Sequence, residues 1–209
     1  MFTGIVEEVG KVTSIQSKPQ AMELTISCSL ILDDMKRGDS ISINGVCLTV
    51  AAFTPHSFTV DVIPETVKSS TMKELKSGSS VNLERAMPAN GRFGGHFVSG
   101  HIDGVGVIRS VKKEANARTK VIEVEPELMK YMMLKGSVSV DGTSLTIFEL
   151  GRNTITISLI PTTQEDSLIG NKGIGAHVNI ECDLLAKYTE RIGTAEPKMT
   201  RNWLAENGF

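Results

Sequence analysis

The sequence predicts an all-β protein built from two similar closed barrels in tandem, followed by a C-terminal helical tail. Three observations lead to this prediction: apolar and polar residues alternate through most of the chain, several motifs recur at a constant offset, and helical spacing appears near the C-terminus. With 209 residues, 40% of them hydrophobic, the chain is long enough to bury two small cores.

The repeat keeps its phase over separated blocks, as a duplicated unit should. Three motifs return 97 residues later: NGVCLTV (44–50) as DGTSLTI (141–147), IPET (63–66) as IPTT (160–163), and VNLE (81–84) as VNIE (178–181). Two upstream pairs shift by one residue, as single gaps in turns would allow: MKRG (35–38) with MLKG (133–136), and GIV (4–6) with GHI (100–102). We therefore expect units at 1–96 and 97–185 and a tail at 186–209.

Each unit reads mainly as short strands. Alternation and β-branched or aromatic residues favour strands in the first unit within 23–28, 39–53, 57–63 and 79–86, with Asn-Gly and Gly at the turns. Five or six strands in about ninety residues must hide their edges, which favours a closed barrel over an open sheet. A short helix is expected in each unit, at 69–78 and at 125–136, from the N-terminal Ser/Thr or Pro and the closing Gly.

The tail has a different periodicity. Leu184, Leu185, Tyr188 and Ile192 follow helical spacing, and the segment 198–209 has a similar character. An amphipathic helix needs a surface to cover, but its pattern does not name the partner. Packing on its own barrels and packing on the tails of sister chains, which would make a homo-oligomer, both remain open.

Composition excludes several classes of protein. The net charge is −2 without a block of like charges, which argues against nucleic acid and against an anionic membrane as partners. No apolar run approaches the ~20 residues of a membrane span, and the first residues do not resemble a signal peptide, so we expect a cytoplasmic protein. Cys28, Cys47 and Cys182 are too far apart for a thiolate metal site, and His96 and His101 lack zinc-helix spacing, so no metal is expected.

Polar residues recur at equivalent strand positions in both units. Cys47 and Thr49 in the first unit match Ser144 and Thr146 in the second. A closed core has no use for such groups unless they find partners, so some of them should face a pocket. The alternative is that Thr simply forms strands well and Cys acts as a small apolar residue. Two similar pockets would imply two similar ligands.

Seven motifs in order resemble the trimeric, internally duplicated riboflavin synthase family: MFTGIV, NGVCLTV, IPET, GGHFVSGH, DGTSLTI, LIPTT and VNIECD. The resemblance covers about residues 1–192 and says little about the segment from 194 onward. It implies that each half is a six-stranded Greek-key barrel that binds one lumazine. The implied reaction is a dismutation: a four-carbon unit passes from one molecule of 6,7-dimethyl-8-ribityllumazine to another, giving riboflavin and 5-amino-6-ribitylaminouracil, with no cofactor.

The resemblance also implies partners. The reaction would occur where the N-terminal barrel of one subunit faces the C-terminal barrel of a neighbour in a homotrimer, so that each catalytic site holds two lumazines. Some relatives are enclosed by a lumazine synthase capsid, which makes lumazine synthase a candidate partner.

Carried over by motif, the site residues fall into two sets that we expect to follow the two units. The N-terminal lumazine site would comprise Gly4, Ile5, Val6, Cys47, Leu48, Thr49, Asp61, Val62, Ile63, Pro64, Glu65 and Thr66. The C-terminal site would comprise Gly100, His101, Ile102, Lys135, Ser144, Leu145, Thr146, Ser158, Leu159, Ile160, Pro161, Thr162 and Thr163. Thr162 cannot reproduce the carboxylate of Glu65, so the two sites are expected to bind unequally.

The implied reaction removes a proton from the 7-methyl group of one lumazine and activates the other. His101, with an ordinary pKa of ~6.5, is the candidate for proton handling; without the resemblance, a hydrogen-bonded loop histidine would be the preferred interpretation. Cys47 and Ser144 are candidates for a transient nucleophile or its orientation, Asp183 for holding a side chain or the substrate, and Thr146 completes the catalytic set.

Two rival functions share the barrel. A lumazine- or flavin-binding antenna protein would be expected to lose the reactive set, which here is complete. A reductase flavin barrel would need a nucleotide-binding domain, and nothing downstream in the sequence offers one.

Overall fold

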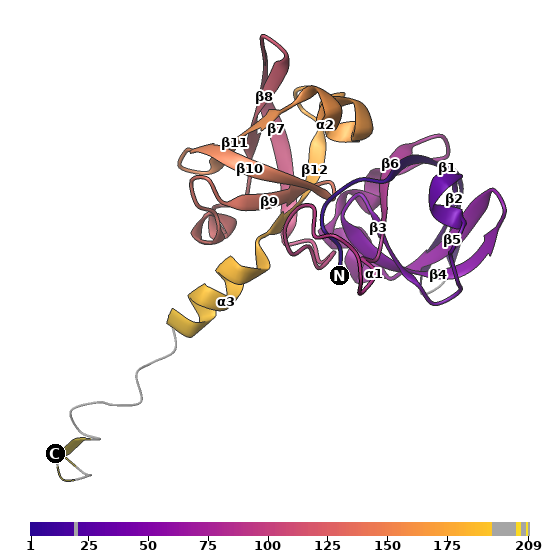
Figure 1. The fold of residues 1–209 in the computed structure, drawn as a ribbon, viewed down its shortest axis with the longest axis horizontal. Helices are drawn as coiled ribbons and strands as arrows, with labels where there is room; N and C mark the ends of the chain where they lie inside the picture. The colour runs from indigo at the N-terminus through magenta and orange to yellow at the C-terminus, as the bar shows by residue number, and fades with distance from the viewer. Residues whose placement is uncertain (19–20, 194–203, 206–207, 209) are drawn as a thin grey trace.

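The computed structural model describes residues 1–18, 21–193, 204–205 and 208, and it contains two closed six-stranded antiparallel barrels with a helix projecting from the second (Figure 1). The first barrel is formed by β1 (Glu8–Lys18), β2 (Ala21–Ser27), β3 (Ser40–Ile43), β4 (Val46–Thr54), β5 (Ser57–Val62) and β6 (Ser80–Arg85). Its strand order, β1-β2-β5-β4-β3-β6, is a Greek key. The predicted all-β fold is therefore confirmed.

The second barrel repeats the first strand by strand. It is formed by β7 (Gly104–Glu114), β8 (Ala117–Glu123), β9 (Ser137–Val140), β10 (Thr143–Leu150), β11 (Thr154–Leu159) and β12 (His177–Cys182), in the same circular order. Both barrels carry a register shift at equivalent places, between Val50 and Ala52 in β4 and between Ile147 and Glu149 in β10. The duplication seen in the sequence thus extends to local irregularities.

The two barrels meet at the turns of the repeated motif. Asn44 and Gly45 have φ of 48° and 83°, and Asp141 and Gly142 have φ of 47° and 79°, as two-residue hairpin turns of type I′ require. A Cβ on Gly45 would lie 2.7 Å from the Gly142 amide nitrogen, and a Cβ on Gly142 would lie 2.7 Å from the Gly45 nitrogen. The glycines in NGVCLTV and DGTSLTI therefore serve both the turn and the barrel contact.

Two buried asparagines tie the barrels together with matching hydrogen bonds. The side-chain amide of Asn82 in β6 donates to the Asp141 carbonyl (2.9 Å), and that of Asn179 in β12 donates to the Asn44 carbonyl (2.8 Å). Their side-chain oxygens accept from Leu168 N (2.9 Å) and Thr71 N (2.7 Å), again in the opposite barrel. Because these groups are buried and paired, the contact fixes one relative orientation of the barrels.

The predicted helix at 69–78 is wrong in extent. An α-helix, α1 (Pro64–Ser69), begins earlier, and only a 3-10 turn, η2 (Thr71–Glu74), lies in the predicted range. The second barrel repeats this with α2 (Pro161–Asp166) and η4 (Leu168–Gly170). Pro64 and Pro161 start these helices because proline suits the first helical position. The second prediction, 125–136, corresponds to a 3-10 helix, η3 (Pro126–Tyr131), whose counterpart is η1 (Leu30–Leu32).

The tail begins with the predicted helix, α3 (Leu184–Gly193), which points away from both barrels (Figure 1). The predicted continuation at 198–209 lies almost wholly outside the described residues. Within the part of the chain that the structure describes, no helix combines the length and the apolar character that crossing a bilayer would require.

Candidate functional site

The predicted polar strand residues point outward from the barrels. Along β4, Leu48 and Val50 are buried in the first core, whereas Cys47 is half-buried and Thr49 is exposed. β10 repeats the pattern, with Leu145 buried and with Ser144 and Thr146 turned outward. Since alternate residues of a strand face opposite sides, the motif presents its polar members to the barrel exterior. Leu48 and Leu145 are therefore available to a ligand only through their main chain.

The N-terminal segment of each repeat crosses to the other barrel. The Ser144 amide donates to the Gly4 carbonyl (2.7 Å), and the Cys47 amide donates to the Gly100 carbonyl (2.8 Å). Phe2 and Val98 form a bridge between the two crossing segments. Close approach requires glycine there, because a Cβ at Gly4 would lie 2.7 Å from Ser144 N and one at Gly100 would lie 2.5 Å from Cys47 Cβ.

This crossing corrects the predicted grouping of the site residues. Gly4, Ile5 and Val6 lie with Ser144 of the second barrel, and Gly100 lies with Cys47 of the first. The prediction assumed that each unit completes its own site. The reason for the difference is physical: the pseudo-twofold contact of the barrels places Gly4 against Ser144 and Gly100 against Cys47.

The site on the first barrel is a cavity of about 410 Å³ on the outer face of β4. Six predicted residues line it: Cys47, Leu48, Thr49, Asp61, Ile63 and Thr66. Arg37 lines it as well; the sequence analysis missed this residue, although it is the repeat counterpart of Lys135. Of the other predicted members, Val62 is buried in the core, while Pro64 and Glu65 are exposed on the first turn of α1. His101 is exposed beside Gly100, and Ile102 packs on the first core.

The site on the second barrel is a smaller cavity, about 160 Å³. Six predicted residues line it: Gly4, Ile5, Val6, Ser144, Thr162 and Thr163. Thr143, Asp166 and Ser167, which were not predicted, complete the lining. Ser158 is half-buried, Leu159 is in the core, and Ile160 and Pro161 are exposed at the end of β11. Lys135 and Thr146 do not line this cavity; the Lys135 ammonium instead lies 4.3 Å from the centroid of the Phe148 ring.

A histidine that sequence reasoning did not select reaches Ser144. Nδ1 of His96 lies 2.7 Å from the Ser144 hydroxyl, and the imidazole is buried. Burial lowers the pKa of His96 below its ordinary value, while the nearby Asp183 carboxylate acts in the opposite direction. A neutral imidazole can accept a proton from a serine hydroxyl, so this pair has the chemistry of a base and its partner. The motif GGHFVSGH contained the signal, but its first histidine, His96, was considered only as a metal ligand.

His101 and Asp183 occupy different surroundings. The His101 side chain is exposed, and its amide donates to the Ser99 hydroxyl (3.3 Å). Asp183 accepts a hydrogen bond from Leu185 N (2.9 Å) at the start of α3 and lines a separate cavity of about 370 Å³ at the base of that helix. Asp183 is therefore a helix cap that also acts electrostatically on His96.

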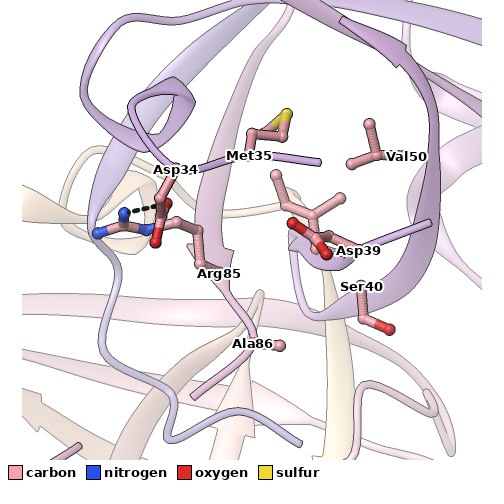
Figure 2. A pocket seen from close by; sticks show the side chains of 8 residues that line it. Asp34, Met35, Asp39, Ser40, Val50, Arg85 and Ala86 are labelled. Carbon is pink, nitrogen blue, oxygen red and sulfur yellow. Dashed lines mark hydrogen bonds and ion pairs between the residues drawn. The ribbon is translucent and has the colours of Figure 1, made fainter. Parts of the chain in front are cut away.

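A further hollow lies beside Arg85, near the end of β6 (Figure 2). It measures about 170 Å³, and no predicted site residue lines it. The Arg85 guanidinium is held by Asp34 (2.7 Å) and Glu7 (2.5 Å), which neutralise it. This hollow is therefore not part of the two matched sites.

Comparison with known proteins identifies the family. The model of the lumazine binding domain matches residues 3–86 and 99–183. A riboflavin synthase of Bacillus subtilis is 52% identical over 100% of both chains, and one of Actinobacillus pleuropneumoniae is 45% identical over 100% of both. The chain belongs to the riboflavin synthase family. As a member of it, the chain is an enzyme of riboflavin synthesis.

Solved structures support the same fold. LumP complexed with riboflavin superposes with a TM-score of 0.80 at 25% identity, covering 87% of this chain and 99% of that chain. LumP complexed with 6,7-dimethyl-8-ribityllumazine superposes with a TM-score of 0.78 at 24% identity, over 87% and 98% of the two chains. The two-barrel architecture of the riboflavin synthase family is thus also the architecture of LumP.

Proposed function

We propose that this member of the riboflavin synthase family binds one 6,7-dimethyl-8-ribityllumazine in each crossed site and transfers four carbons from one to the other. The observation that supports this most is the matched pair of outward-facing strand segments, 47–49 and 144–146, each hydrogen-bonded to the other repeat's N-terminal segment. Two identical substrates need two similar pockets, and holding them in the reacting geometry can supply ~7–11 kcal/mol of the barrier.

Main-chain groups of the motif strands offer a place for the pyrimidinedione ring. β4 pairs with β3 at Val46–Thr49, but it pairs with β5 only from Val50 onward. Since successive residues of a strand point their amide and carbonyl groups to opposite sides, Cys47 and Thr49 face the side that β5 leaves open. Gly100 already accepts from the Cys47 amide there, which leaves the Thr49 main chain for the ring. Thr146 holds the same place in β10.

Side chains around each ring supply the remaining roles. Arg37, Asp61 and Thr66 suit the ribityl hydroxyls in the first site, and Thr162, Thr163 and Asp166 suit them in the second. His101 beside the first site is the proposed proton acceptor for the 7-methyl group. Ser144, oriented by the neutral His96, is the proposed nucleophile or hydroxyl donor of the second site, and Cys47 holds the equivalent position in the first.

We also propose that the chain assembles as a homotrimer through α3. The apolar side chains Leu185, Tyr188 and Ile192 are 59%, 62% and 74% exposed on a helix that projects from the barrels (Figure 1). Such a face would be costly in water unless a partner covers it. Sedimentation equilibrium should give three chains per particle for the native protein and single chains for Leu185→Asp with Tyr188→Asp; a monomeric native protein would contradict this. Association with lumazine synthase stays a prediction, as does a cytoplasmic location.

Turnover of the purified protein tests the activity and the roles together. Native protein mixed with the lumazine should produce riboflavin absorbance, and His101→Gln should lower the rate by about a hundredfold, as expected for loss of a general base. Cys47→Ser should have a smaller effect, because a hydroxyl remains. The control is His56→Gln, because His56 is an exposed histidine of the β4–β5 turn; this variant should keep the native rate. Tight binding without turnover would point to an antenna protein, and an undiminished His101→Gln rate would remove that residue from proton transfer.

A further inference from the structure

Two buried carboxylates hold the crossing segments. Glu84 in β6 is 5% exposed and Glu181 in β12 is 1% exposed, and they are equivalent in the repeat. Neither was selected as a site residue, and neither lies on the outward strand faces that form the pockets.

Each carboxylate receives hydrogen bonds from two consecutive residues of a crossing segment. Glu84 accepts from the Thr3 amide (2.7 Å), the Thr3 hydroxyl (2.9 Å) and the Gly4 amide (3.1 Å). Glu181 accepts from the Ser99 amide (2.6 Å), the Ser99 hydroxyl (2.6 Å) and the Gly100 amide (2.9 Å). A carboxylate is suited to this task because it only accepts hydrogen bonds, whereas a glutamine would also bring an NH₂ group against these donors.

The held residues then contact the opposite barrel. Gly4, fixed by Glu84 of the first barrel, accepts the amide hydrogen bond of Ser144 in the second. Gly100, fixed by Glu181 of the second barrel, accepts that of Cys47 in the first. Each carboxylate is therefore linked, through two successive hydrogen bonds, to a strand in the other half of the chain.

We infer that Glu84 and Glu181 are crossed positioning residues, each setting the substrate site of the barrel to which it does not belong. The link to substrate rests on the site assignment proposed above, whereas the link between carboxylate and strand rests on the hydrogen bonds alone. The inference assigns Glu84 to the site at Ser144 and Glu181 to the site at Cys47.

Hydrogen–deuterium exchange on the full-length protein without ligand tests the crossing. Glu84→Gln should speed exchange in peptides that contain Ser144 by about tenfold to a hundredfold and leave those that contain Cys47 unchanged, since a hydrogen bond to a charged group is lost. Glu181→Gln should do the reverse. Glu8→Gln is a matched control, because Glu8 also accepts from several amides, of Ser29, Leu30 and Ile31, but within its own barrel. Faster exchange confined to the mutated residue's own barrel, or equal in both, would overturn the inference.

Milder variants keep the test usable if a glutamine variant does not fold. Thr3→Val and Ser99→Ala each remove one hydroxyl donor and leave the main chain intact. They should give the same crossed pattern with smaller amplitude. Equal changes of the exchange rate in the Ser144 and Cys47 peptides of these variants would also count against the inference.

Lumazine binding then separates this inference from the site assignment. The effect of Glu84→Gln on the lumazine dissociation constant should be non-additive with Ser144→Ala and additive with Cys47→Ser, and Glu181→Gln should show the opposite pairing. Crossed exchange with unchanged lumazine binding would support the positioning and reject the site assignment. Uncrossed exchange with intact binding would reject the positioning and leave the assignment in place.

Discussion

The two barrels share their topology, turns and register shifts, yet they differ on the faces that line the sites. Ala51 beside the first cavity corresponds to Phe148 in the second barrel, where Lys135 lies over the ring. The cavities also extend differently: the first measures about 410 Å³ and the second about 160 Å³, and they share only the equivalent lining pairs Cys47 with Ser144 and Thr66 with Thr163. Duplication thus preserved the topology and most core positions, while the outward residues of equivalent strands diverged in size and chemistry.

One difference lies inside a barrel. Leu24 of β2 and Lys120 of β8 hold the same register position, opposite Val60 and Ile157 respectively, and both are buried. The Lys120 ammonium donates to the Gly170 carbonyl (3.3 Å) and to the Lys172 carbonyl, so it fastens η4 and the following turn to the barrel. That turn, within GNKGIG (170–175), precedes β12. A charged residue has thus replaced an apolar one where carbonyl groups can accept its hydrogen bonds.

The largest effects are expected where the barrels are most alike. Gly45→Ala and Gly142→Ala should each lower the free energy of unfolding by about 4 kcal/mol, because a Cβ would meet the opposite turn and a positive φ disfavours alanine. Chemical denaturation measures both. Gly38→Ala is the control: its φ is 94°, but no atom lies within 4 Å of the added Cβ, so only the strain of about 1 kcal/mol should remain. Unequal losses at Gly45 and Gly142 would show that the contact is not symmetric.

The second prediction concerns the pH dependence of stability that buried Lys120 should produce and that its apolar counterpart Leu24 cannot. Burial, with the neighbouring charges of Arg118 and Lys172, lowers the pKa of Lys120 from 10.5 to about 8. Between pH 8 and 10.5 the unfolded chain then binds more protons than the folded chain, so stability should rise with pH in this window. Relative to Lys120→Met, the native protein should gain roughly 3 kcal/mol across it, measured by denaturation at each pH. Parallel stability curves for the two proteins would contradict a buried, titrating lysine.

The smallest effect concerns the size of the sites. Ala51→Phe should weaken lumazine binding at the first site by about tenfold, since Ala51 lines the first cavity and an aromatic ring there would fill space that the ligand needs. Phe148→Ala should remove the ring that holds Lys135, and so release this ammonium from a cation–π contact worth ~0.5–1 kcal/mol to reach a ligand on β10. Isothermal titration of the lumazine into each variant measures both. Affinities that respond to neither change would place the ligand elsewhere on the strands.

Much of the fold could be predicted from the sequence because its signals are local. The repeated Asn-Gly and Asp-Gly turns and the alternation of 47–50 identify strands, hairpins and their outward faces. Helix α1 was missed because IPET reads equally as the end of a strand, and only the proline at Pro64 hints at a helix start.

The site could be predicted as a set of residues but not as an arrangement. No local pattern shows that Gly4 pairs with Ser144, since that contact joins residues 140 positions apart through the packing of two whole barrels. Arg37 had a signal in its repeat partner Lys135. Glu84 and Glu181 had one too, in VNLE and VNIE, but their role depends on the crossing and so appears only in three dimensions.

A crystal structure of the protein with an unreactive lumazine analogue tests the central claim most directly. The account predicts one analogue against Thr49 and Gly100, and a second against Thr146 and Gly4, so that each ring contacts both repeats. An analogue held by residues of a single repeat, or bound away from β4 and β10, would contradict the account.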